Sequence, residues 1–275
     1  MNTLQVATIK AATIGTPTGR GGGAKAPSPA DCMKDCIAWY SPKRQGITNE
    51  YLQDHYLDDD AVLQDLSGNG NDIALHNMEG EEGGGYVNDD GDLVFDGSDD
   101  YGECVKQIAS ADLLNGAFAT VVDTSYHDGY KHVYFCCFEG DNPTSSNHIF
   151  SLYKDGSGEG RYYMGYNKQL NRIYWLKDST IEENMLSLIV NTLVGCQPDA
   201  SFNTTIAFFP GVTSGKNAII QTPEEVDAMW VGRNQNGYFP LFFRELLFFK
   251  RNLTHKEAEW VYDNILTTDT NNQNS

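Results

Sequence analysis

Two short loops rich in acidic and amide side chains could bind a hard cation. They span residues 65–72 and 95–101, and each follows or precedes a short apolar segment. Ca2+ takes six to eight oxygen ligands, which loop carboxylates and backbone carbonyls can supply. The predicted ligands are Asp65, Asn69, Asp96, Asp99 and Asp100. The alternative is that these residues only shape turns, because Asn and Asp favour turns without any ion.

Aromatic side chains near loops and strand ends form a second group with binding potential. The chain has 15 Tyr and 13 Phe, and aromatic residues make up 12% of it. The electron-rich face of an aromatic ring attracts the C–H groups of a sugar. The predicted ligand-binding residues are Tyr126, Tyr130, Tyr166, Trp175 and Tyr238. The alternative for most aromatic residues is packing in the core.

The cysteines and histidines show no spacing typical of catalysis. Cys32 and Cys36 could share a helix face, but zinc needs four ligands and no second pair completes the set. We expect reduced thiols, because the six cysteines lack the spacing of a disulfide framework. Cys136 and Cys137 are adjacent in a predicted strand, which predicts that one faces the core and the other the surface. The six histidines suggest no catalytic triad.

The net charge excludes one class of partner, and the lack of a long apolar segment excludes another. With 19 basic and 38 acidic residues, the chain carries a formal charge of −19. Nucleic-acid binding depends on neutralising phosphates, so we predict no nucleic-acid partner. No segment approaches the ~20 apolar residues of a membrane-spanning helix, so we predict no membrane insertion. The first 18 residues also lack the pattern of a secretion signal.

The elements that must position these residues are short strands. They recur with turn signals between them, which is typical of an all-β sandwich or jelly roll. The predicted strands cover residues 36–40, 73–77, 93–95, 117–123, 131–138, 148–153, 162–166, 172–176, 186–191, 204–210, 228–233 and 239–249. The predicted core includes Trp39, Leu66, Leu75, Leu93, Phe95, Val231, Leu246 and Phe248.

Two further segments differ from this pattern. Residues 54–60 include four Asp and predict a solvated loop or part of a cation site. At the other end, Thr254 and Glu257 form a capping box that opens a short helix. Ala258, Val261 and Ile265 then fall on one helix face and should pack on a sheet.

Residues 1–30 are rich in Gly, Ala, Thr and Pro and read as an extended arm without a core of its own. One interpretation is a loose tail, and the other is an anchor that becomes ordered on a partner. The alternation in residues 4–9 would suit a strand that pairs with another chain.

The motifs identify a family resemblance. Asp65-Leu66-Ser67-Gly68-Asn69-Gly70-Asn71, Phe95-Asp96-Gly97-Ser98-Asp99-Asp100-Tyr101 and the ending Arg251-Asn252-Leu253-Thr254 resemble laminin-G-like domains of the concanavalin A-like lectin/glucanase group. The resemblance implies a two-sheet antiparallel jelly roll with a short C-terminal helix. We expect the arm at residues 1–30, this domain at residues 31–267 and a polar tail at residues 268–275.

The same resemblance implies a function. Such domains are typically extracellular binding modules for carbohydrates, and some bind Ca2+. The arm makes the chain similar to head or tail-fibre decoration proteins of tailed phages. We therefore expect a non-enzymatic lectin-like module on a virion surface, binding a host or mucosal glycan. Residues 1–30 would contact capsid or fibre proteins, in a homo-oligomer. The alternatives are an extracellular or bacterial cell-surface location, and a decoration protein that binds no sugar.

A glycoside hydrolase of the glucanase branch is the other alternative. Relatives in that branch carry Glu-x-Asp-x-x-Glu on one strand, and the nearest match here is Glu225-Val226-Asp227-Ala228-Met229-Trp230. Trp230 replaces the last acid, which leaves the acid/base role empty. Glu81 and Glu82 are adjacent and would point to opposite faces. We therefore predict no hydrolase activity, although other carboxylates could meet in space.

Overall fold

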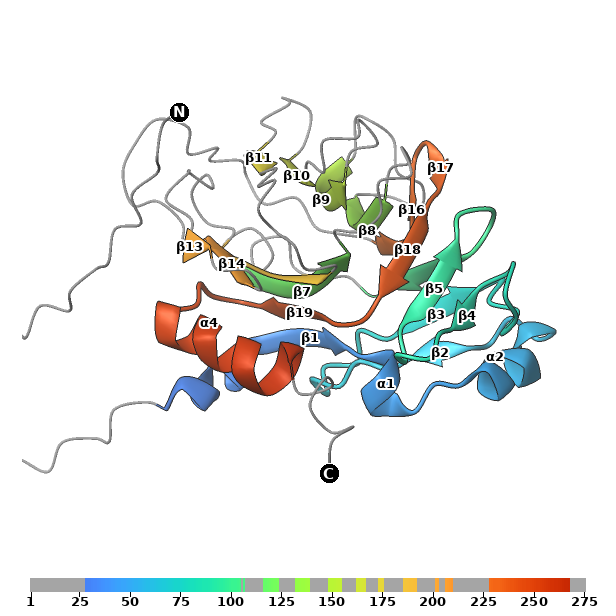
Figure 1. Ribbon diagram of the computed structural model, residues 1–275, viewed down its shortest axis with the longest axis horizontal. Coiled ribbons are helices and arrows are strands. Elements are labelled where there is room, and N and C mark those ends of the chain that lie inside the picture. The colour runs from blue at the N-terminus through green and yellow to red at the C-terminus, as the bar shows by residue number, and fades with distance from the viewer. Residues whose placement is uncertain are drawn as a thin grey trace, which may run out of the picture.

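The computed structural model describes residues 28–104, 106, 116–123, 132–138, 148–154, 162–166, 173–175, 185–191, 201–202, 206–209 and 228–267 (Figure 1). The predictions for residues 1–27, Tyr126, Tyr130, Glu225, Asp227 and the C-terminal tail lie outside these residues. Within the described part of the chain, no helix has the length and apolar character needed to cross a bilayer.

Two large sheets dominate the described residues. The six-stranded sheet has the order β1 (Cys36–Tyr40), β19 (Leu246–Phe249), β7 (Ala117–Asp123), β12 (Met185–Asn191), β14 (Ile206–Phe209) and β13 (Ser201–Phe202). The eight-stranded sheet has the order β11 (Ile173–Trp175), β10 (Tyr162–Tyr166), β9 (His148–Lys154), β8 (His132–Phe138), β15 (Ala228–Val231), β6 (Tyr101–Cys104), β3 (Ile73–His76) and β2 (Val62–Leu63). The predicted all-β sandwich is confirmed. Its strand pairs are antiparallel except that β12 and β14 run parallel.

Smaller elements complete the fold. A three-stranded sheet joins β18 (Pro240–Phe243), β5 (Leu93–Asp96) and β4 (Tyr86–Val87), and a hairpin joins β16 (Arg233–Asn234) to β17 (Gly237–Tyr238). The described helices are η1 (Pro29–Asp35), α1 (Pro42–Gln45), α2 (Asn49–Tyr56), α4 (His255–Val261) and η2 (Tyr262–Leu266).

The core lies between the two large sheets, where alternate side chains of each strand meet. Phe135 of β8 contacts Phe118 of β7 edge to face, with ring centroids 5.3 Å apart. It also contacts Phe248 of β19 at 5.1 Å. These aromatic contacts join the two sheets at their centre.

Most of the predicted core is confirmed, and two residues were assigned wrongly. The confirmed residues are buried: Leu75, Leu93, Phe95, Val231, Leu246 and Phe248. Trp39 and Leu66 are only partly buried. Trp39 lies between the core-facing Ala38 and Tyr40, so alternation turns it to the other face of β1. Leu66 lies in a turn, where its backbone N–H donates to the carbonyl of Trp39.

The predicted C-terminal helix is confirmed as α4, which covers the outer face of the six-stranded sheet (Figure 1). The side chain of Thr254 accepts from the backbone N–H of Glu257, and Glu257 accepts from the backbone N–H of Thr254 at 2.8 Å. Ala258, Val261 and Ile265 are buried against β7 and β19, as predicted.

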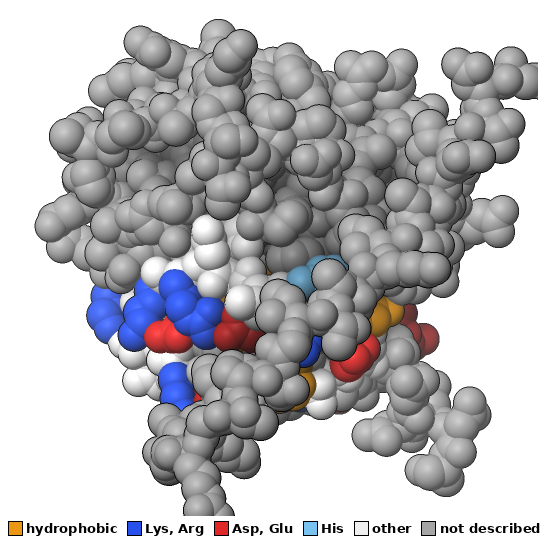
Figure 2. Space-filling model, turned by 90° about the vertical axis from the view of Figure 1, so that its left-hand side faces the viewer, with side chains coloured by type: hydrophobic (Ala, Val, Ile, Leu, Met, Phe, Trp, Pro, Cys, Tyr) orange, Lys and Arg blue, Asp and Glu red, His pale blue; other side chains and the backbone are white. Residues whose placement is uncertain are grey.

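Charged side chains gather where α4 begins (Figure 2). Arg251 pairs there with Asp35 at 2.6 Å and with Glu257 at 2.7 Å. The Arg251 guanidinium lowers the pKa of Glu257 to about 2. The capping box therefore keeps its ionised carboxylate well into the acidic range.

The expected loop at residues 54–60 is partly wrong, because α2 continues to Tyr56. Thr48 caps this helix by accepting from the backbone N–H of Tyr51 at 3.2 Å, a signal that its sequence already contained. Leu52 is buried and attaches the helix to the core.

The prediction for Cys136 and Cys137 was right about their opposite sheet faces and wrong about exposure. Cys137 joins the core between the sheets and lies opposite Met229, whereas Cys136 lies opposite Trp230. Both side chains have no exposed area, because every residue of β8 is buried. Burial raises the pKa of Cys136 to about 12, so this thiol stays protonated and unreactive.

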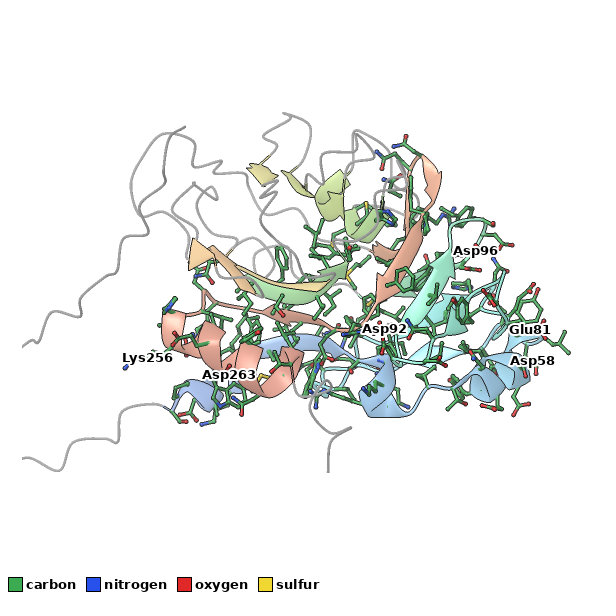
Figure 3. All side chains as sticks on the ribbon, viewed as in Figure 1. Asp58, Glu81, Asp92, Asp96, Lys256 and Asp263 are labelled. Atoms are coloured by element: carbon green, nitrogen blue, oxygen red, sulfur yellow. The ribbon has the colours of Figure 1, made fainter. Side chains whose placement is uncertain are left out.

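Two adjacent charges of opposite sign, the half-buried Arg244 and the buried Glu245, form the crossing from β18 to β19. Arg244 donates to both carboxylate oxygens of Asp92, at 2.6 and 2.7 Å. Glu245 accepts from the indole N–H of Trp39 and from Nε of Arg44. The side chains of Asp92 and Glu245 are only 3% and 1% exposed. Asp92 immediately precedes strand β5 and Asp96 is its last residue, as labelled in Figure 3.

Replacing Arg244 should strongly destabilise the fold. Arg244→Ala leaves the Asp92 carboxylate buried without its guanidinium partner, and breaking such a pair costs about 3–5 kcal/mol. Urea denaturation followed by tryptophan fluorescence measures the change. The control is Lys34→Ala, which removes an exposed ion pair with Asp31 and should leave the midpoint unchanged. Equal midpoints for both variants would contradict the assigned role of the crossing.

Candidate functional site

The first acidic loop uses its carboxylate to bind the backbone. Asp65 accepts from the backbone N–H groups of Trp39 and Ser67, both at 2.9 Å, and of Asn71 at 3.1 Å. Asn69 in the same loop donates from its amide to the carbonyl of Cys36 at 3.1 Å. These bonds tie the loop to strand β1.

The second acidic loop is closed by its own side chains. Asp100 accepts from the backbone N–H of Asp96 at 2.6 Å, and Asp96 accepts from that of Ser98 at 2.6 Å. Gly97 has φ +84, and a Cβ there would lie 2.5 Å from Cδ of Pro240. Glycine is therefore required both by the backbone conformation and by the close approach of β18.

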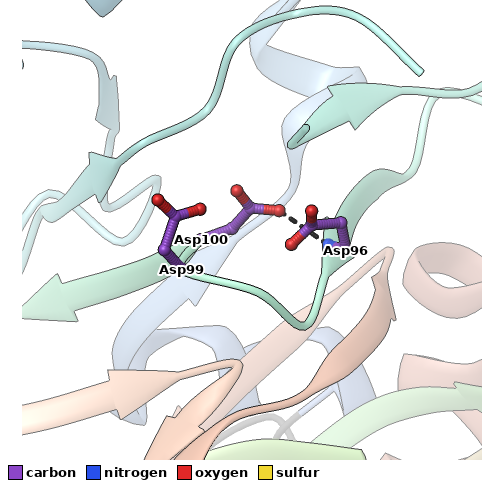
Figure 4. A group of neighbouring side chains, drawn as sticks. All are labelled: Asp96, Asp99 and Asp100. Atoms are coloured by element: carbon purple, nitrogen blue, oxygen red, sulfur yellow. Dashed lines mark hydrogen bonds between the residues drawn. The ribbon is translucent and has the colours of Figure 1, made fainter. Parts of the chain in front are cut away.

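This loop brings three of the five predicted Ca2+ ligands together. One carboxylate oxygen from each of Asp96, Asp99 and Asp100 lies within 4.8 Å of the others (Figure 4). Asp65 is in no such group of metal-ligating side chains among the described residues, and Asn69 lies in its loop. The structure therefore divides the predicted set between two loops.

Asp100 is the buried member of this group. Asp99 is exposed and Asp96 half-buried, but Asp100 has no exposed area, and its Oδ1 has no hydrogen-bond partner in the described structure. Burial raises the pKa of Asp100 to about 7, and the nearby Asp96 charge adds to the shift. Three carboxylates at this spacing are suited to a hard cation, whose charge would favour the ionised form of Asp100.

A second cluster lies on the outer face of the eight-stranded sheet. Met229 and Val231 of β15 face the core, so Trp230 between them points outward, beside Glu103 of β6. Tyr101 of β6 faces the same side. We call the group of Tyr101, Trp230, Arg233 and Tyr238 the aromatic face.

Gly232 places Arg233 in this group. Strict alternation after Trp230 would turn residue 233 back toward the core. Gly232 instead has φ +72, and its N–H donates to the carbonyl of Val133 at 3.0 Å. A Cβ on Gly232 would lie 3.0 Å from the Phe95 ring, so the position also lacks room for a side chain. The break in alternation brings Arg233 to the same side as Trp230.

Three aromatic rings surround the Arg233 guanidinium. Its Cζ lies 3.8 Å from the ring centroid of Trp230, 4.6 Å from that of Tyr101 and 5.0 Å from that of Tyr238. Arg233, Tyr101 and Tyr238 are half-buried, whereas Trp230 is 3% exposed. Tyr101, Tyr238 and the guanidinium therefore keep some exposed area, whereas the Trp230 ring is buried beneath the guanidinium.

Polar groups border the aromatic face. Glu103 accepts from the indole N–H of Trp230 at 3.2 Å, and the His76 ring stacks on Tyr101 with centroids 4.5 Å apart. Nδ1 of His76 lies 2.9 Å from a carboxylate oxygen of Asp59. Burial raises the pKa of Tyr101, so its hydroxyl stays neutral and can donate or accept.

The predicted ligand-binding residues are only partly placed. Tyr238 lies in the aromatic face, while Tyr166 and Trp175 contribute backbone to β10 and β11 of the same sheet. The sequence analysis missed Tyr101 and Arg233 as binding residues, and it considered Trp230 only as a replaced acid. The one local signal was Gly232 inside an apolar strand, which is typical of a bulge.

Comparison with known proteins supports the fold only. No family model matches the sequence, and no curated protein matches it. Among solved structures, a Trypanosoma rangeli sialidase in complex with 2,3-difluorosialic acid is 12% identical, with a TM-score of 0.50 over 90% of this chain and 35% of the sialidase. The receptor-binding domain of botulinum neurotoxin mosaic serotype C/D is 13% identical, with a TM-score of 0.51 over 86% of this chain and 52% of that domain. The chain thus spans about a third to a half of these proteins.

The Asp96–Asp99–Asp100 group predicts a Ca2+ response that depends on pH. Without a cation, the raised pKa of Asp100 means that ionisation opposes folding. This contribution to stability is complete below the ordinary Asp pKa of 3.8 and is lost as pH rises through about 7. At pH 8, saturating Ca2+ should raise the melting temperature by about 5–10 °C, as expected at ~100-fold excess over Kd. At pH 5, protons compete with the ion and the rise should shrink.

Asp100→Asn keeps an acceptor for the Asp96 N–H but removes the charge, so it should abolish both the loss of stability as pH rises from 3.8 to about 7 and the Ca2+ response. Asp58→Asn, at an exposed acid on the loop after α2, is the matched control and should keep both. If the wild-type protein melts at the same temperature with Ca2+ and with a chelator at pH 8, the loops do not bind Ca2+ and their acidic residues only shape turns.

Proposed function

We propose that this protein is a carbohydrate-binding module that holds its glycan at the aromatic face and does not hydrolyse it. The observation that carries the proposal is the convergence of Tyr101, Trp230 and Tyr238 around Arg233 on the outward side of a sheet. Ligand sites combine apolar and aromatic surface with a few placed polar groups. Here the rings offer stacking surface, while Arg233 and Glu103 offer a donor and an acceptor for hydroxyl groups.

The shared architecture agrees with this class of function. One neighbour is a sialidase crystallised with difluorosialic acid, and the other is a receptor-binding domain with tetraethylene glycol bound. The residues of the aromatic face, rather than this likeness, support the site.

Two observations argue against the hydrolase alternative. Trp230 stands in place of the last acid of the expected motif, and its side chain is buried among Phe138 and Ala228. Asp100 has a pKa of about 7, which would suit a general acid, but it has no exposed area and cannot reach a glycosidic oxygen.

Removing one ring should weaken glycan binding. Tyr238→Ala deletes a half-buried ring at the hairpin while leaving the core intact. A stacked ring contributes about 0.5–1.5 kcal/mol, so affinity for the best ligand on a glycan array should fall roughly threefold to tenfold. Tyr56→Ala, at a 39% exposed ring on α2, is the control and should bind normally. If Tyr238→Ala and Tyr56→Ala bind the glycan with equal affinity, the aromatic face is not the binding site. Release of reducing ends from the glycan by the wild-type protein would favour the hydrolase alternative.

We further propose that the module decorates a phage virion, anchored through the arm at residues 1–30 in a homo-oligomer. The family resemblance and the Gly-, Ala- and Pro-rich composition of the arm support this placement. An extracellular or bacterial cell-surface location is the alternative. A decoration that binds no sugar would follow from a negative glycan array.

Deleting residues 1–27 should leave the domain folded and prevent its incorporation into particles. The deletion keeps Ser28, whose backbone N–H donates to Asp31 at the start of η1 at 2.7 Å, so the described fold should melt at the wild-type temperature. Particle incorporation is measured by immunogold electron microscopy, with Tyr56→Ala as the full-length control. Normal incorporation of the truncated protein would show that the arm is not the anchor.

A further inference from the structure

We propose that Arg233 binds the carboxylate of an acidic sugar, so that the ligand is a glycan carrying a uronic or sialic acid. This inference rests on the proposed function, because it names the class of glycan for the same site. It follows from the charge balance of the chain, the placement of the guanidinium and the groups around it.

The charge balance makes Arg233 unusual. The chain carries a net charge of −19, and the other arginines in the described part of the chain each pair with an acid: Arg44 with Glu245, Arg244 with Asp92, and Arg251 with Asp35 and Glu257. Among the described residues, Arg233 has no carboxylate within ion-pair distance, and its recorded contacts are with aromatic rings. No acid of the described residues therefore competes for the Arg233 guanidinium.

The placement of the guanidinium suits a carboxylate. Stacking on Trp230 at 3.8 Å uses a face of the planar group and holds it rigid. The N–H donors lie in the plane, at the edge of the stacked face, and a guanidinium edge matches two carboxylate oxygens. Arg233 is half-buried among these rings, and partial burial strengthens a charged hydrogen bond relative to one in bulk water.

The neighbours of Arg233 favour a sugar acid over a simple anion. Glu103, fixed by the Trp230 indole N–H, presents an acceptor beside the rings and would repel a second negative charge. A sugar acid carries one carboxylate for Arg233, hydroxyl groups that can donate to Glu103, and apolar C–H faces for Tyr101 and Tyr238. A polyanion such as a heavily sulfated chain would meet repulsion from Glu103 and Asp59.

Carboxyl reduction of the ligand tests the proposal with the unaltered protein. The full chain is measured against uronic-acid and sialylated glycans and against the same glycans with each carboxyl reduced to an alcohol. We expect a loss of at least tenfold in affinity on reduction, and weaker binding as salt is raised. Separate measurements with uronic-acid glycans and with sialylated glycans distinguish the two sources of the carboxylate.

Arg233 variants assign the effect to this residue. Arg233→Gln should abolish the preference for the acidic glycan over its carboxyl-reduced form. Arg233→Lys should keep only part of this preference, because an ammonium lacks the two-pronged edge of a guanidinium. Lys34→Gln, at an exposed lysine far from the aromatic face, changes the net charge equally and should keep the preference. Melting temperatures of all variants check the fold.

Each outcome has a distinct meaning. Equal binding of acidic and neutral glycans would overturn this inference and keep the proposed function. An acid preference that survives in Arg233→Gln would also overturn it, as would selective binding of sulfated glycans. Binding to no glycan would overturn the proposed function itself.

Discussion

The fold depends on two adjacent charges of opposite sign at the crossing between β18 and β19, which hold the buried carboxylates of Asp92 and Glu245 in ion pairs. Arg244 forms a two-pronged pair with Asp92 at the start of β5, and Glu245 accepts from Trp39 and Arg44 next to β1. The backbone carbonyl of Glu245 also accepts from the Thr120 hydroxyl of β7 at 2.7 Å. One dipeptide therefore fixes a small sheet on one side and the six-stranded sheet on the other. A buried charge that loses its partner is costly, so alternative registers of this crossing are disfavoured.

The aromatic face depends on a local break in strand periodicity. Met229, Trp230 and Val231 alternate between core and outer face, and Gly232 then adopts a left-handed conformation. Without that break, Arg233 would point toward Phe95 and the core, where a charge without a partner would be unstable. The same glycine is packed against the Phe95 ring, so the site and the core constrain one backbone position together.

The two acidic loops show that one residue type can play two roles. Asp65 accepts three backbone N–H bonds and acts as a structural clamp. Asp100 accepts from the Asp96 N–H, but its other oxygen is buried without a partner, and its pKa is raised. Burial is the main cause of the raised pKa of Asp100, because desolvation disfavours the ionised carboxylate.

The sequence alone determined the local features of this protein. Alternation predicted the core side of β3, β5 and β19. The capping box at Thr254 predicted α4, and Thr48 was an available signal for α2 that the acidic composition obscured. Each of these signals acts within about four residues, so it can be read from a short segment. The loops that contain Asp65 and Asp100 were recognised as turns in the same way.

Only the tertiary structure decided which of these residues meet. Trp230 and Glu103 are neighbours because β15 pairs with β6 across more than a hundred residues of sequence. Asp65 binds the backbone of β1, whereas Asp100 binds the backbone of its own loop. Both faces of β8 are buried, including Cys136 and Cys137. This burial comes from the packing of other parts of the chain on each face, which no local sequence pattern specifies. Register and layer packing are set by the summed burial of distant segments, and the side chains that form the aromatic face become one surface only when that packing is complete.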